Sequence, residues 1–211
     1  MIKLSKPKRV FMMSEEPEND VESDGYARMK DNNNNSQLSS NQLFFYDDVT
    51  RVSIYNLNRN LDVVAKTLQL LKINYNLPII PSIELFVNSE GGEVFSAFSA
   101  VDRIKSCPVP VHTYVEGIAA SAATLLSVCG HKRYIRKNSF MLIHQIQSGL
   151  WGSFAEFKDE MQNLELIMKY IKSIYLTHTK IPENDLIEIL KHDTYLDAEE
   201  CLKYGLVDEI V

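Results

Sequence analysis

The stretch Gly117-Ile-Ala-Ala-Ser121-Ala-Ala123 places a single hydroxyl among residues that are too small to hide it. It follows an apolar run at residues 111–115 that predicts a β-strand, and it leads into a predicted helix. A serine at such a strand-to-helix turn can present its oxygen to a substrate, and the helix N-terminus favours negative charge nearby. On its own, a small-residue run with a serine is more typical of tight helix packing.

Two further motifs give this serine a chemical context. Asn88-Ser-Glu-Gly-Gly92 is a glycine turn that closes an apolar run at residues 83–87, and Met141-Leu-Ile-His144-Gln145 places a histidine at the end of another. Apolar residues recur at offsets of three and four over residues 61–71 and 94–104, which predicts helices between the strands. This alternation predicts a parallel α/β sheet, in which sites form at the carboxyl ends of strands. All three motifs fall at such ends, so they predict a nucleophile, an oxyanion loop and a base at one edge.

The composition is that of an ordinary globular chain. Of 211 residues, 45% are hydrophobic and 24% are charged, and the formal net charge of −6 argues against a general nucleic-acid binder. The three cysteines are widely spaced and lack the paired spacing of metal ligands, which fits reduced thiols in a cytosolic compartment. The basic N-terminus has no apolar signal region, and residues 117–130 fall short of the roughly 20 residues that a spanning helix needs. We therefore expect a cytoplasmic protein that binds no membrane, no nucleic acid and no metal.

Composition also divides the chain near residue 42. Residues 1–42 are polar and rich in asparagine, so they bury too little apolar surface to offset the entropy of ordering and are expected to be flexible. The folded body is expected over residues 43–211. It should begin with strand material at residues 43–46 and 52–54.

The longest helical pattern covers residues 154–179, where apolar residues recur every three or four positions. A helix of about 26 residues spans about 39 Å, which overhangs a domain of this size. It is therefore either a core helix or an arm that reaches a neighbouring subunit. Trp151 lies just before it, between Gly149 and Gly152, and is a candidate interface residue.

Ser121 needs a base to take its proton, and His144 is the best-placed histidine. It ends a buried-looking strand. By contrast, His112 lies within a strand, His131 lies in a basic loop, and His178 closes the long helix, where a cation suits the dipole.

A third group must hold the imidazole tautomer, and two backbone N–H groups must hold an oxyanion. Asp193, Asp197 and Asp208 are candidates for the first role, and residue chemistry alone does not choose between them. The run Asp197-Ala-Glu-Glu200 predicts a helix cap, with Gly205 ending that helix. Ala122 offers one backbone N–H for the oxyanion, and the glycine turn offers the other.

Together these motifs resemble the ClpP family of self-compartmentalising serine proteases over residues 43–211. The resemblance rests on the glycine turn, the serine run, the histidine strand and Asp193-Thr-Tyr-Leu-Asp-Ala-Glu-Glu200, which leads to Tyr204-Gly-Leu-Val-Asp208. It implies a crotonase-like α/β fold of stacked βαβ units with a long handle helix.

The resemblance also implies roles for individual residues. It makes Ser121 the nucleophile, His144 the base and Asp193 the orienting acid, and it assigns the oxyanion hole to the backbone N–H groups of Gly92 and Ala122. The family usually has proline at the position of Glu90 and commonly methionine at the position of Ala122. Residues 1–42 do not look like the family's gating N-terminus.

For assembly, the resemblance implies a tetradecamer of two stacked heptameric rings joined by the handle at residues 146–179. The partner would be an AAA+ unfoldase of the ClpX, ClpA or ClpC type, and the substrates unfolded polypeptides. No nucleotide-binding loop occurs, so no cofactor is expected and ATP is used only by the partner. Phe86 is a candidate for the partner-binding cleft, with a core role as the alternative. Two other functions stay open: a non-catalytic ring subunit, and an acyl-CoA enzyme on the same fold.

Overall fold

The computed structural model describes residues 41–149 and 151–211, which belong to one compact unit, Ser39–Val211. The prediction for residues 1–42 lies outside this part of the chain, apart from Asn41 and Gln42. The elements, in chain order, are β1 (Gln42–Phe45), α1 (Arg51–Asn74), β2 (Ile83–Ser89), α2 (Val94–Ser106), β3 (Val111–Ala120), α3 (Ala122–Val128), β4 (Lys132–Ile135), β5 (Phe140–Leu142), α4 (Phe154–His178), α5 (Glu183–Ile189), β6 (Tyr195–Leu196), α6 (Ala198–Lys203) and β7 (Glu209–Ile210).

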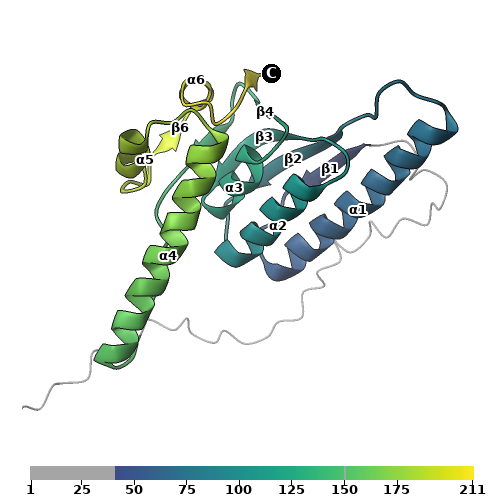
Figure 1. Cartoon of the computed structure of the whole chain (residues 1–211). Coiled ribbons are helices and arrows are strands. Elements are labelled where there is room, and N and C mark those ends of the chain that lie inside the picture. Colours follow the sequence, from purple (N-terminus) through teal and green to yellow (C-terminus); the bar gives the residue numbers. More distant parts are fainter. Residues whose placement is uncertain (1–40, 150) are drawn as a thin grey trace, which may run out of the picture. The chain divides into compact units, whose positions relative to one another are not determined.

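The strands form a mainly parallel sheet in the order β1-β2-β3-β4-β7 (Figure 1). The first half of β3 pairs with β4, and its last three residues pair with β5 instead. The change of partner occurs around Gly117, which has a positive φ of 70° and whose N–H donates to Ser139 Oγ at 2.8 Å. The short strand β6 then adds antiparallel to β5. The predicted α/β fold with parallel strands is confirmed, and this branching brings the histidine strand beside the serine strand.

One prediction about the first helix was wrong. Residues 52–54 were expected to be strand material, but they form the first turn of α1. Thr50 caps this helix through a capping box with Ser53, which fixes its start upstream of the β-branched residues. Ile54 then continues the buried helical face of Leu57 and Leu61. Capping and helical spacing therefore outweigh the local strand preference of the β-branched side chains.

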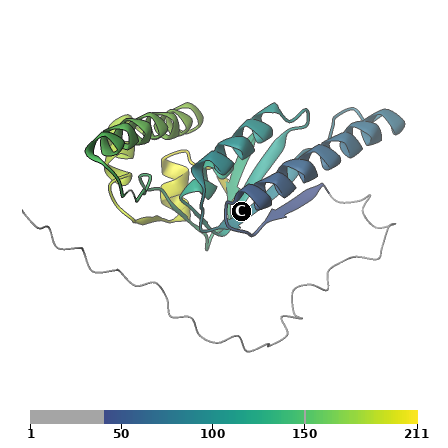
Figure 2. The ribbon, with the colours of Figure 1, turned by 90° about the horizontal axis from the view of Figure 1, so that it is seen from below.

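Helices α1 and α2 cover one face of the sheet, as Figure 2 shows from below. Leu85 and Val87 on β2 point into this core and are fully buried. The alternate residue Phe86 points to the other face, where it stacks between Phe44 and Tyr114 at ring distances of 4.9 and 4.8 Å. Tyr134 extends the stack from β4. We call Phe44, Phe86, Tyr114 and Tyr134 the aromatic ladder; they are partners in register across four strands.

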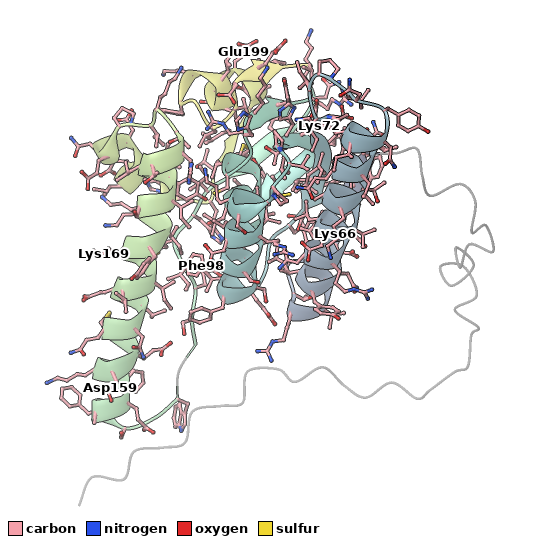
Figure 3. The ribbon with its side chains drawn as sticks, turned by 45° about the vertical axis from the view of Figure 1, so that its right-hand side comes forward. Lys66, Lys72, Phe98, Asp159, Lys169 and Glu199 are labelled. Atoms are coloured by element: carbon pink, nitrogen blue, oxygen red, sulfur yellow. The ribbon has the colours of Figure 1, made fainter. Side chains whose placement is uncertain are left out.

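Helix α4 is the long helix that the sequence predicts, and it projects from the body (Figure 1). Ser153 caps it with Glu156 in a capping box. Its only buried residues, Ile171 and Tyr175, lie in its C-terminal third. Asp159 marks its free end in Figure 3, and Phe98 on α2 faces its middle part. This shape favours the arm over the core helix. None of the helices in residues 41–149 and 151–211 combines the length and the apolarity that a membrane crossing requires.

Candidate active site

Ser121 occupies the turn between β3 and α3, with a strained backbone at φ 51° and ψ −124°. Such a conformation costs on the order of 1–3 kcal/mol and persists only where the surroundings hold it. Here the Ser121 N–H donates to Leu142 O on β5 at 2.8 Å, and the Thr124 N–H donates to Ser121 O at 3.1 Å. The turn is therefore fixed on both sides by backbone hydrogen bonds.

The structure brings Ser121, His144 and Asp193 together. His144 Nε2 lies 2.8 Å from Ser121 Oγ, and His144 Nδ1 lies 2.9 Å from Asp193 Oδ1. The imidazole is shielded, with its side chain 18% exposed, whereas the Asp193 side chain is 68% exposed. Because β3 and β5 pair with Ala120 opposite Leu142, both polar groups emerge from the same sheet edge.

The other two candidate aspartates, Asp197 and Asp208, have structural roles away from His144. Asp197 caps α6 by accepting from the Glu200 N–H at 2.9 Å, and Gly205 follows that helix with a φ of 64°. The Asp208 carboxylate accepts hydrogen bonds from the backbone N–H and the Nε–H of the buried Arg133. Burial would raise the pKa of Asp208, but the hydrogen bonds and charge of Arg133 outweigh burial and lower this pKa. Among the three candidates, Asp193 alone contacts His144.

The glycine turn packs directly against the nucleophile. Gly91 and Gly92 have φ angles of 99° and 142°, which only glycine adopts without strain. A β-carbon on Gly91 would lie 2.6 Å from Ala120 O, 2.8 Å from Ser121 Cβ and 3.0 Å from Ala122 N. The turn is also paired with the loop before α1, because the Val49 N–H donates to Gly91 O at 2.7 Å. Glycine is therefore required at position 91 for the turn to approach the serine this closely.

A cavity of about 390 Å³ opens beside this constellation. Gly92, Ser121, Ala122 and His144, four of the predicted site residues, line it. Leu125, Ile171 and Tyr175 contribute its apolar wall, and Glu90 and Glu93 its acidic residues. A substrate in this cavity would meet the serine oxygen, the imidazole and two backbone positions able to donate hydrogen bonds.

Two residues of the site were missed in the sequence. Thr124 Oγ1 donates to Ser121 O, and the Tyr175 hydroxyl contacts Thr124 Oγ1 in turn. Both residues are buried, and burial raises the pKa of Tyr175 well above its usual value. The single Thr124 hydrogen is used toward Ser121, so the tyrosine hydroxyl is the donor to Thr124. The three residues thus form a chain of hydrogen bonds from α4 to the nucleophile turn.

Phe86 lies away from this site, on the opposite side of the sheet from α1 and α2. It is only 6% exposed because Phe44 and Tyr114 cover its ring. Phe44, at 62% exposed, is the ladder residue most open to solvent. The surface that Phe86 supports is therefore formed largely by its neighbours.

Comparison with known proteins agrees with the motifs. The model of the Clp protease family matches residues 39–211. The chain belongs to the Clp protease family. It is 30% identical over 131 residues to the ATP-dependent Clp protease proteolytic subunit of Deinococcus radiodurans and 34% identical over 131 residues to proteolytic subunit 2 of Chlamydia muridarum. Each match covers 61% of this chain and 64% of the relative, so it spans less than two thirds of those proteins. The expected ClpP-type fold is confirmed.

Proposed function

We propose that this chain is the serine endopeptidase subunit of a barrel-shaped, self-compartmentalised protease. The observation that carries the proposal is the hydrogen-bonded series of Ser121 Oγ, the His144 imidazole and the Asp193 carboxylate, at 2.8 and 2.9 Å. With Asp193 accepting from Nδ1–H, the other ring nitrogen of His144 is free to accept the serine proton. This is the arrangement that turns a weak hydroxyl into a nucleophile.

The proposed reaction proceeds in two acyl-transfer steps. Ser121 Oγ attacks the peptide carbonyl carbon while its proton moves to His144 Nε2, and Asp193 stabilises the imidazolium. The resulting oxyanion is held by the backbone N–H groups of Gly92 and Ala122. Collapse breaks the C–N bond as His144 returns the proton to the leaving amine. Water then attacks the acyl-enzyme carbonyl carbon while His144 takes its proton, the bond from that carbon to Ser121 Oγ breaks, and His144 returns the proton to Oγ as the acid leaves. The reaction needs no cofactor because the chain supplies both nucleophile and base.

The strained turn supports this role. A residue with φ 51° costs stability, and such positions cluster where a functional geometry requires them. The backbone at Gly91 packs so closely against Ser121 that a β-carbon there would lie 2.8 Å from Ser121 Cβ and 3.0 Å from Ala122 N, which supports an oxyanion loop beside the nucleophile. A non-catalytic ring subunit would have no need to keep a strained serine within hydrogen-bond distance of an oriented histidine. An acyl-CoA enzyme would need the oxyanion donors but not that pair.

Assembly through α4 is the second part of the proposal. Trp151 is 85% exposed, and the outer turns of α4 expose further aromatic and apolar residues. An apolar cavity also lies between α2 and α4, lined by Phe95, Phe98, Leu166 and Tyr170. Surfaces of this kind are typical of interfaces. We propose that α4, as the handle, joins copies of this chain into two stacked seven-membered rings.

The third part concerns the partner. We propose that an ATP-driven unfoldase docks on the aromatic ladder and feeds unfolded polypeptide to the barrel, in the cytoplasm. The ladder supports this because it carries stacked rings on a sheet face that no helix of the described chain covers. Alone, the chain should cleave short unstructured peptides slowly, because a folded substrate offers no extended strand to the site.

Hydrolysis of a short fluorogenic peptide by the full chain tests the proposal. Wild type should show turnover and Ser121→Ala should show none, with equal secondary structure in both. Labelling of wild-type Ser121 by a fluorophosphonate separates this function from a non-catalytic ring subunit and from an acyl-CoA enzyme. Turnover that survives in Ser121→Ala would refute the assignment of the nucleophile.

A further inference from the structure

Part of the wall of the cavity beside Ser121 is apolar. Leu125, Ile171 and Tyr175 line it and are each largely buried. The Tyr175 hydroxyl is engaged with Thr124, so the residue offers ring carbons rather than a free polar group. This wall suits the methylene stem of a long side chain, because burying methylene groups is favourable.

The same cavity carries two carboxylates next to the glycine turn. Glu90 directly precedes Gly91, and Glu93 directly follows Gly92, so the acidic residues flank the proposed oxyanion loop. No lysine or arginine from the described part of the chain lines this cavity. Both side chains are exposed, and neither takes part in an ion pair within the described residues.

Among the described residues, no cationic side chain forms an ion pair with Glu93. Glu93 Oε2 accepts from Ser96 Oγ at 2.7 Å, which fixes the carboxylate but carries no positive charge to it. Arg51 lines the adjacent cavity that also includes Glu93, yet the two residues form no ion pair. The lining of this cavity therefore combines apolar side chains with two carboxylates, and it includes Ser121.

We propose that this cavity accepts a lysine or arginine side chain of the substrate, on the residue whose carbonyl Ser121 attacks. The inference rests on the proposed peptidase function and names the substrate class of that site. Long basic side chains bury their stems along apolar surface and keep the charged head in polar surroundings. Here Leu125, Ile171 and Tyr175 take the stem, and Glu90 and Glu93 attract the head.

Charge rather than size distinguishes this proposal from a purely apolar pocket. Leucine, methionine and norleucine fit the wall but gain nothing from the carboxylates. A cation within several ångströms of two partly solvated carboxylates gains enough for a preference of about fivefold or more. The preference should weaken with salt, because exposed charges are screened.

Matched peptides on the full chain test this. Three fluorogenic peptides differ only in the residue before the fluorophore: lysine, arginine or norleucine, the last being a lysine stem without its charge. We expect kcat/KM to be at least about fivefold higher for the basic peptides than for norleucine. Equal or better cleavage of the norleucine peptide would overturn the proposal.

Variants assign the preference to the two carboxylates. Glu90→Gln and Glu93→Gln each keep shape and remove charge, so each should reduce the ratio of lysine to norleucine cleavage, and the double variant should bring it close to one. Glu199→Gln is the control, because Glu199 lies on α6 and does not line the cavity (Figure 3). An unchanged ratio in the double variant would contradict the role of these residues.

Labelling of wild type with an uncharged fluorophosphonate separates the preference for basic side chains from the peptidase function itself. Labelling at Ser121 together with a norleucine preference would overturn the basic specificity and leave the peptidase function standing. Absence of both labelling and turnover in the assembled protein would overturn the peptidase function and this inference with it.

Discussion

Replacing Gly91 with alanine should damage catalysis more than it damages the fold. The new methyl group would lie 2.6 Å from Ala120 O and 2.8 Å from Ser121 Cβ, where real β-carbons are not found. Its backbone would also have to hold a φ of 99°. The conformational cost alone is of order 1–3 kcal/mol. For a body of this size, that corresponds to a fall in Tm of roughly 3–10 °C.

The catalytic effect should be larger because the clash falls on the nucleophile turn. The third contact of the added methyl is Ala122 N at 3.0 Å, the atom proposed to hold the oxyanion. Displacing one oxyanion donor costs about 10²- to 10³-fold in kcat. We therefore expect Gly91→Ala to lose at least about a hundredfold in kcat for a fluorogenic peptide, measured well below its Tm.

Gly149→Ala is the matched control. A β-carbon at Gly149 would meet no atom of the described chain within 4 Å. Because Gly149 lies in the segment proposed to join copies of this chain, kcat is compared only after sizing has shown that both variants assemble as wild type does. Gly149→Ala should then keep kcat and Tm close to wild type. Circular dichroism and thermal melts on both variants separate a local effect from unfolding. A Gly91→Ala protein that keeps kcat within threefold of wild type would refute the packing argument for the glycine turn.

Three other changes probe separate parts of the structure. Tyr175→Phe removes the hydroxyl that bonds to Thr124 and should lower kcat about fivefold with little change in KM, measured by steady-state kinetics on one peptide. Asp208→Asn should lower the Tm near pH 7, because Arg133 depresses the folded pKa of Asp208 below its unfolded value. The stabilisation from this pair is present above the unfolded pKa and is lost as the pH falls through the folded pKa. The difference in Tm between wild type and Asp208→Asn should therefore shrink in acid. Phe86→Ala should spare cleavage of short peptides and impair cleavage of folded proteins with a cognate unfoldase and ATP, and equal loss of both activities would place its effect in the core.

The parallel sheet and the proximity of Ser121 to His144 could be predicted because both follow from local patterns. Apolar runs mark the strands, and the residue that follows each run must lie at the carboxyl edge. In the structure β3 extends to Ala120 and β5 ends at Leu142, so Ser121 and His144 both emerge at that edge. Asp193 could not be separated from Asp197 and Asp208 in this way, because the three differ in tertiary contacts rather than in local pattern.

The remaining features depend on contacts between distant segments. Tyr175 reads in sequence as one more apolar position of a long helix, and nothing local relates it to Thr124, 51 residues earlier. Glu93 is the N-cap residue of α2 in the structure, and nothing in the local sequence shows that it also lines the cavity beside Ser121. Residues 52–54 favour a strand by composition, and only the capping box at Thr50 shows that the helix has already begun.

Mapping a fluorophosphonate adduct by mass spectrometry tests the central claim most directly. Wild type and His144→Ala are labelled side by side, digested, and the modified residue is identified from its peptide. We predict an adduct on Ser121 in wild type and much slower labelling in His144→Ala, because the serine then has no base within hydrogen-bond distance. An unlabelled Ser121 in folded, assembled wild type, or an adduct on another residue, would contradict the assignment of this chain as a serine peptidase acting through Ser121.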